Sequence, residues 1–168
     1  HSFPTRRSSD LTNIENSLYE PLSIMFLLQD NTSQEIFELR LAIEGETAGL
    51  ASKKINSEEL QQLKLLVDKM KETDELNLSV GLDKEFHYKI AQATHNGLIL
   101  NMMNAVSSLV NSYRKDAFIK IVEITGNSKI IVAQHENIYK AISESNPEES
   151  VRAMKVHINY SNDRMKDI

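Results

Sequence analysis

The chain has 168 residues and no cysteine, and its formal net charge at pH 7 is −5. A length in this range predicts one domain with a core of ordinary size. The absence of cysteine excludes disulfides and thiolate metal sites, so any metal ion must be bound by histidine nitrogen and by carboxylate or amide oxygen. The acidic balance argues against a domain that grips nucleic acid by itself, because phosphate contacts require basic side chains. No apolar run is long enough to cross a bilayer.

Residues 1–11, HSFPTRRSSDL, differ in character from the sequence that follows them. They show no apolar face, and they lack the apolar stretch that a signal peptide requires. Residues 1–10 are also the continuous translation of a common sequencing-adapter string, whose last two bases begin a leucine codon. We therefore expect residues 1–11 to be an adapter-derived artefact and residues 12–168 to be the natural chain.

The rest of the chain predicts an all-α fold, an antiparallel bundle of six or seven helices. An apolar segment over residues 17–29 indicates the first helix. The second and third helices are expected over about 32–54 and 56–71, because each begins with a capping box. These boxes are formed by Thr32 with Glu35 and by Asn56 with Glu59.

A polar loop over residues 72–77 precedes a fourth helix that ends at Asn96-Gly97. The apolar residues that follow predict a fifth helix, which continues or kinks before it ends at Gly126-Asn127. A further helix is expected over residues 128–143. The last begins at Asn146-Pro147, where an asparagine cap precedes proline at the first helical position.

Histidine and aspartate side chains recur on the expected inner faces of three of these helices. Asp83 and His87 are one helical turn apart and therefore share a face. His135 lies at helical spacing from Ile131, Ile138 and Ile142, and His157 lies one turn from Met154. His95 stands apart at a helix end.

A single inward histidine is usually a core residue with a hydrogen-bond partner. Three such histidines and one aspartate are harder to explain in this way, because each buried polar group without a partner costs about 1–3 kcal/mol. One shared divalent metal would satisfy all four side chains, and imidazole with carboxylate suits Zn, Ni, Co, Mn or Fe. Two alternatives stay open: a metalloenzyme with a His3Asp site in a helical bundle, and a hydrogen-bonded cluster without metal.

Arg40 is a second anomaly, because it interrupts an apolar stripe between Ile36 and Ile43. Either its stem is buried and its head reaches water or a glutamate such as Glu44, or the cation faces an internal cavity, ready for a carboxylate. The basic pairs Lys53-Lys54 and Arg114-Lys115 are interpreted as solvated surface. Phosphate loops, zinc-protease motifs and activated serines are not visible, so we expect no enzyme and no catalytic residues.

Four segments of the chain resemble one family. They are EIFELRLAIEGETAGLA at 35–51, LDKEFHYKIAQATHN at 82–96, QHENIYKAI at 134–142 and AMKVHINY at 153–160. In this order they are similar to motifs of the C-terminal ligand-binding domain (FCD) of FadR-type regulators in the bacterial GntR family. The resemblance covers nearly all of the chain after residue 11.

The resemblance implies an effector-sensing domain of a cytoplasmic transcription regulator, which forms a homodimer and binds a small organic acid. It implies that Asp83, His87, His135 and His157 bind the metal, and that Arg40 lies near the effector. Members of the family join this domain to an N-terminal winged helix-turn-helix, and no such domain precedes Ser17. We therefore expect DNA binding only through that missing domain.

Overall fold

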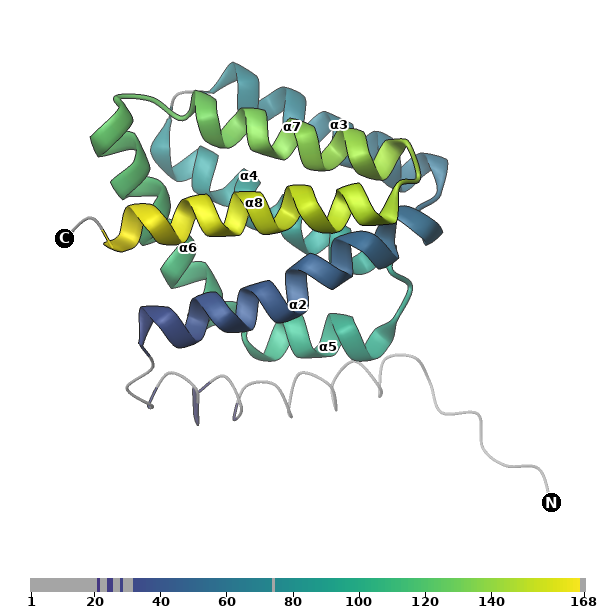
Figure 1. Ribbon diagram of the computed structural model, residues 1–168, viewed down its shortest axis with the longest axis horizontal. Coiled ribbons are helices and arrows are strands. Elements are labelled where there is room, and N and C mark those ends of the chain that lie inside the picture. Colours follow the sequence, from purple (N-terminus) through teal and green to yellow (C-terminus); the bar gives the residue numbers. More distant parts are fainter. Residues whose placement is uncertain (1–20, 22–23, 26–27, 29–31, 74, 167–168) are drawn as a thin grey trace.

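The structure, a computed structural model, describes residues 21, 24, 25, 28, 32–73 and 75–166. Within these ranges the chain forms helices and no strand, so the predicted all-α bundle is confirmed (Figure 1). The helix predicted over residues 17–29 lies largely outside the described residues, and residues 1–11 lie wholly outside them. The helices are α2 (Ser33–Lys54), α3 (Ser57–Glu72), α4 (Leu76–Ala93), α5 (Gly97–Ala105), α6 (Ser107–Thr125), α7 (Lys129–Ser143) and α8 (Pro147–Lys166).

Local sequence signals explain where most of these helices begin. Thr32 and Asn56 open α2 and α3 with the predicted capping boxes. The side-chain oxygen of Asn96 accepts a hydrogen bond from the backbone N–H of Leu98 at the start of α5 (3.0 Å). Asn146 accepts one in the same way at the start of α8. The first unpaired N–H groups of four helices are therefore satisfied by side chains that the sequence identified.

The predicted fifth helix is two helices, α5 and α6, and a single residue separates them. Val106 has φ −96° and ψ 1°, which is outside the α-helical region. Gly126 ends α6 in the left-handed conformation, with φ 75°, which glycine adopts without strain. The break at Val106 lets α6 change direction and pack against α8, α4 and α2.

Helix α8 lies at the centre of the bundle, between α2 and α7, and runs in the opposite direction to both (Figure 1). Helix α2 approaches α8 closely at Gly49, where a Cβ atom would lie only 2.7 Å from Cγ2 of Val151. The absence of a side chain at this position therefore sets the distance between the two helices. This distance matters for the site below, because α2 carries Arg40 and α8 carries His157.

Apolar side chains from all the described helices except α5 form the main core, which includes Leu63, Phe86, Ile90, Ile138, Met154 and Ile158. Several polar and charged side chains are buried within the same bundle. Among the described helices, none has the length and apolar character needed to cross a membrane.

Candidate metal centre

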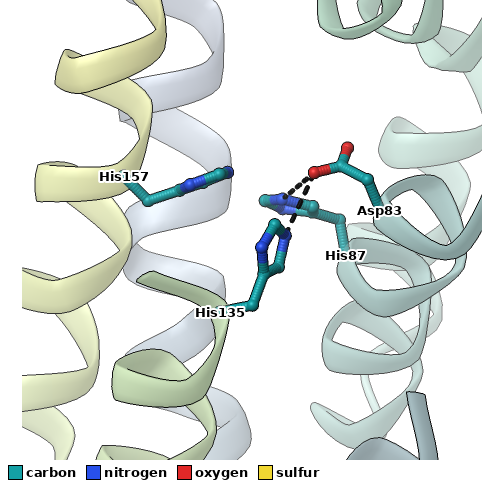
Figure 2. Close-up of side chains that lie close together, drawn as sticks. All are labelled: Asp83, His87, His135 and His157. Carbon is teal, nitrogen blue, oxygen red and sulfur yellow. Dashed lines mark ion pairs between the residues drawn. The ribbon is translucent and has the colours of Figure 1, made fainter. Parts of the chain in front are cut away.

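The structure brings together the four side chains that the sequence singled out (Figure 2). Asp83 and His87 extend from α4, His135 from α7 and His157 from α8. All four are buried, and one nitrogen or oxygen atom from each lies within 4.8 Å of the others. Helical spacing placed each residue on an inner face, and the packing of α4, α7 and α8 makes those faces meet.

The size of the cluster suits one metal ion. Two ligand atoms on opposite sides of an ion, each at about 2.1 Å, are separated by about 4.2 Å. The 4.8 Å span of the four side chains is only slightly larger.

Hydrogen bonds outside the cluster fix how two of the imidazole rings are protonated. Nδ1 of His135 lies 2.8 Å from the carbonyl oxygen of Ile131, and Nδ1 of His157 lies 3.0 Å from Oε1 of Gln134. Both partners are acceptors, so each Nδ1 carries the proton and donates it. In the neutral form of each ring, Nε2 then has a free lone pair. This arrangement is typical of histidines that bind a metal through Nε2.

One contact inside the cluster joins two acceptors whenever the His135 ring is neutral. Nε2 of His135 lies 3.0 Å from Oδ1 of Asp83, and it is buried without a hydrogen-bond partner. Nε2 of His87 is buried without a partner as well, 3.9 Å from the same oxygen. Lone pairs that face one another repel, whereas a cation between them would be bound by both. The donor set therefore fits a divalent metal.

A network of buried charges adjoins the cluster on the side of α2 and α6. Glu44 receives hydrogen bonds from Nε of Arg40 (2.8 Å) and from Nη2 of Arg114 (2.5 Å). Its Oε2 also lies 2.6 Å from Nδ1 of His87, outside the direction of a hydrogen bond. Nε of Arg114 lies 3.8 Å from Oδ2 of Asp83. Two cations and two carboxylates thus compensate one another in the interior.

The network corrects one interpretation of the sequence and refines another. Arg114 was expected on the solvated surface, but only 7% of it is exposed, because the direction of α6 turns it towards Glu44. Lys115, Lys53 and Lys54 are exposed as expected. Arg40 does not reach water: it is 1% exposed and pairs with Glu44, while it also lines the internal cavity described below.

His95 stays outside the site, as its position in the sequence indicated. It is exposed at the end of α4, and its Nε2 lies 2.8 Å from Oε1 of Glu59. It therefore offers a natural control for experiments on the buried histidines.

The pKa values favour the protonation states that bind metal. Burial alone would raise the pKa of Asp83, but the nearby His135, His87 and Arg114 outweigh it and hold that pKa below its ordinary value. Burial and the Arg114 cation lower the pKa of His87 to about 4, against the opposing effect of nearby carboxylates. Burial and the two neighbouring histidines lower the pKa of His157. At neutral pH the aspartate is therefore ionised, and His87 and His157 are neutral.

A small cavity adjoins the cluster. It is lined by Arg40, Asp83, Arg114, His157 and Ser161, and by the apolar side chains Phe118, Ile121 and Ile131. Its volume of about 10 Å³ is roughly the space that one water molecule requires. Nη2 of Arg40 and Nε of Arg114 are both buried without a hydrogen-bond partner. Each of the two guanidinium groups thus has one N–H group without a hydrogen-bond partner, and both side chains line this small cavity.

Residues 35–160 match the FCD domain family. The chain is 28% identical to an uncharacterized HTH-type transcriptional regulator, YcbG, of Bacillus subtilis over 87% of this chain and 60% of that protein. It is also 28% identical to the HTH-type transcriptional regulator LutR of B. subtilis, over 85% of this chain and 66% of LutR. The Glc operon transcriptional activator of Escherichia coli is 25% identical over 88% of this chain and 61% of the activator.

A solved structure supports the same assignment. Streptococcus agalactiae GntR superimposes with a TM-score of 0.65 and 26% sequence identity, over 82% of this chain and 63% of that one. The chain thus spans about 60% of the length of the proteins that it matches. The relatives named here are transcription regulators, and none of them is named as a metalloenzyme, the alternative that the histidines and aspartate alone would also allow. The chain belongs to the FCD domain family.

Proposed function

We propose that this domain binds one divalent metal through Asp83, His87, His135 and His157. The observation that carries the proposal is the 3.0 Å approach of Nε2 of His135 to Oδ1 of Asp83, because both atoms are acceptors once Nδ1 donates to Ile131. A purely hydrogen-bonded cluster would need a proton between them. A metal ion removes the repulsion and also uses the free Nε2 of His87. Zn, Ni, Co, Mn and Fe all accept this donor set.

We further propose that the effector is a small organic acid, bound beside the metal. The unpartnered donors of Arg40 and Arg114 line the cavity next to Asp83 and His157. A carboxylate that leaves water must be compensated by cations and hydrogen-bond donors. The bound metal would supply positive charge and a coordination position, and the two guanidinium groups would supply directed N–H donors.

Effector binding would act by moving helices. A cavity of about 10 Å³ holds no organic acid without displacement of the side chains around it. These side chains belong to α2, α4, α6, α7 and α8, so a ligand would change how the helices pack. In the whole protein, we propose, residues 12–168 form a homodimer whose changed packing alters DNA binding by an N-terminal winged helix-turn-helix. The protein would act in the cytoplasm, where bacterial DNA is located.

The first test is metal content. Protein purified without a histidine tag is incubated with Zn, Ni or Mn, desalted and analysed for bound metal. We expect one ion per chain. Protein that takes up none of these metals would refute the metal site.

The second test is titration of the loaded protein with a panel of small carboxylates. Arg40→Gln keeps a donor for Glu44 but loses the charge and Nη2, so it should retain the metal and bind the acid at least about tenfold more weakly, a loss of about 1.4 kcal/mol. Arg152→Gln is the matched control, because Arg152 is exposed and pairs with the exposed helix neighbour Glu149. Equal affinity of wild type and Arg40→Gln would leave the metal site intact and refute the role of Arg40.

A further inference from the structure

Glu44 is the residue through which the metal cluster and the two arginines contact each other. Its side chain is 3% exposed. One carboxylate oxygen accepts from Arg40 on its own helix, and the other faces both Arg114 of α6 and His87 of α4. A single carboxylate therefore touches a candidate metal ligand and both candidate anion donors.

Each arginine is only partly satisfied by Glu44. Arg40 donates to Glu44 through Nε, and its Nη2 has no hydrogen-bond partner. Arg114 donates to Glu44 through Nη2 and to Asn111 through Nη1, and its Nε has no hydrogen-bond partner, although it lies 3.8 Å from Oδ2 of Asp83. Both free donors belong to side chains that line the cavity. The carboxylate of Glu44 thus already binds both guanidinium groups. It is the same kind of partner that the carboxylate of a ligand would be.

The charges of the side chains around this cavity decide how strongly a further anion is attracted. Arg40 and Arg114 carry two positive charges, and Glu44 and Asp83 carry two negative ones. Without metal these four groups compensate one another, so a further anion gains little by entering. A divalent cation adds two positive charges, and the cavity then attracts an anion.

We propose that Glu44 is the internal counter-anion that makes anion binding depend on metal. It is a positioning residue: it holds Nδ1 of His87 away from the metal and compensates the charges of Arg40 and Arg114. This inference rests on the proposed function. It predicts that removal of the charge at residue 44 shifts metal affinity and anion affinity in opposite directions.

The test compares Glu44→Gln with Glu46→Gln. Glu46 lies on the same helix, but its side chain is 64% exposed and pairs with Lys155 at 3.0 Å. Zn²⁺ affinity is measured by competition with a chromophoric chelator, and acetate affinity of metal-free protein is measured by NMR titration. We expect Glu44→Gln to bind Zn²⁺ about 10–100-fold more weakly, as is typical when a group that orients a metal ligand is lost. We expect it to bind acetate without metal several-fold more tightly than the wild type does, and Glu46→Gln to match the wild type in both.

A second variant keeps the test decisive. Glu44→Asp retains the charge but is one methylene shorter, so it should weaken Zn²⁺ binding and leave acetate affinity at the wild-type level. If acetate affinity rises equally in both variants, space and not charge is responsible, and the inference is wrong. Zn²⁺ and acetate affinities that fall together in Glu44→Gln, or do not change, also overturn it. A wild type that binds no Zn²⁺ would refute the proposed metal site itself, and this inference with it.

Discussion

Substitution of His135 by alanine separates the packing role of this side chain from its proposed role as a ligand. His135 is fully buried, and its ring packs edge-on against Phe86 at a centroid distance of 4.8 Å. Truncation of a buried side chain of this size removes such contacts and leaves a cavity, at a cost of about 2–4 kcal/mol. In a domain of this length we expect the melting temperature of the metal-free protein to fall by about 5–15 °C.

Metal adds a second and independent effect. At a free Zn²⁺ concentration 100-fold above its dissociation constant, binding to the folded state alone stabilises the wild type by about 2.7 kcal/mol. This corresponds to an increase in melting temperature of about 5–10 °C. The His135→Ala variant loses one of four ligands and should show little or no increase at the same concentration.

The assay is thermal unfolding followed by circular dichroism, with EDTA and with Zn²⁺, for wild type, His135→Ala and His95→Ala. His95 is exposed and lies outside the cluster, so its variant should keep the full increase caused by Zn²⁺. If His135→Ala keeps that increase too, Zn²⁺ binds elsewhere and His135 is not a ligand.

Two further predictions concern packing and pH. Gly49→Ala should destabilise the domain by about 1–3 kcal/mol in urea unfolding, because its Cβ would meet Val151 at 2.7 Å and the carbonyl oxygen of Pro147 at 3.3 Å. Gly45→Ala is the control: its Cβ would meet the flexible end of Lys155, and alanine favours the helix, so equal losses in the two variants would contradict the reasoning. The metal-free domain should lose stability as pH falls from about 6.5 to about 4, because the unfolded chain takes up protons on His87 and His157 that the folded state, with lowered pKa values, resists. A urea midpoint at pH 5 equal to that at pH 7.5 would argue that these histidines are not buried in neutral form.

The sequence was informative about the cluster because its ligands lie on helices with clear apolar faces. A histidine or aspartate on such a face must be inside the bundle, whichever helix it meets there. Asp83, His87, His135 and His157 all satisfy this condition, and the structure brings the four side chains together. The capping boxes of Thr32 and Asn56 were likewise local, so they could be predicted without any knowledge of packing.

Arg114 and its contact with Glu44 could not be placed in this way, although the sequence did offer Glu44 as a partner of Arg40 on the same helix. Arg114 stands beside Lys115 in a polar part of the sequence, which is typical of a solvated surface. Its burial depends on the break at Val106, which sets the direction of α6, and on the carboxylate of Glu44, which is 70 positions away in the chain. The partner that makes a buried charge tolerable lies on another helix, and periodicity within one helix carries no information about it.

The buried charges around the cavity point to function more strongly than to stability. A buried ion pair is often no more stable than apolar side chains of similar volume, because desolvation offsets the attraction between the charges. Arg40, Glu44, Asp83 and Arg114 nevertheless lie together in the interior, beside three imidazole rings and a nearly filled cavity. Apolar residues would hold α2, α4 and α6 together equally well, but they could not respond to a metal ion or to an anion. The cavity and its charged side chains are best explained as the part of the bundle whose net charge changes when a ligand binds.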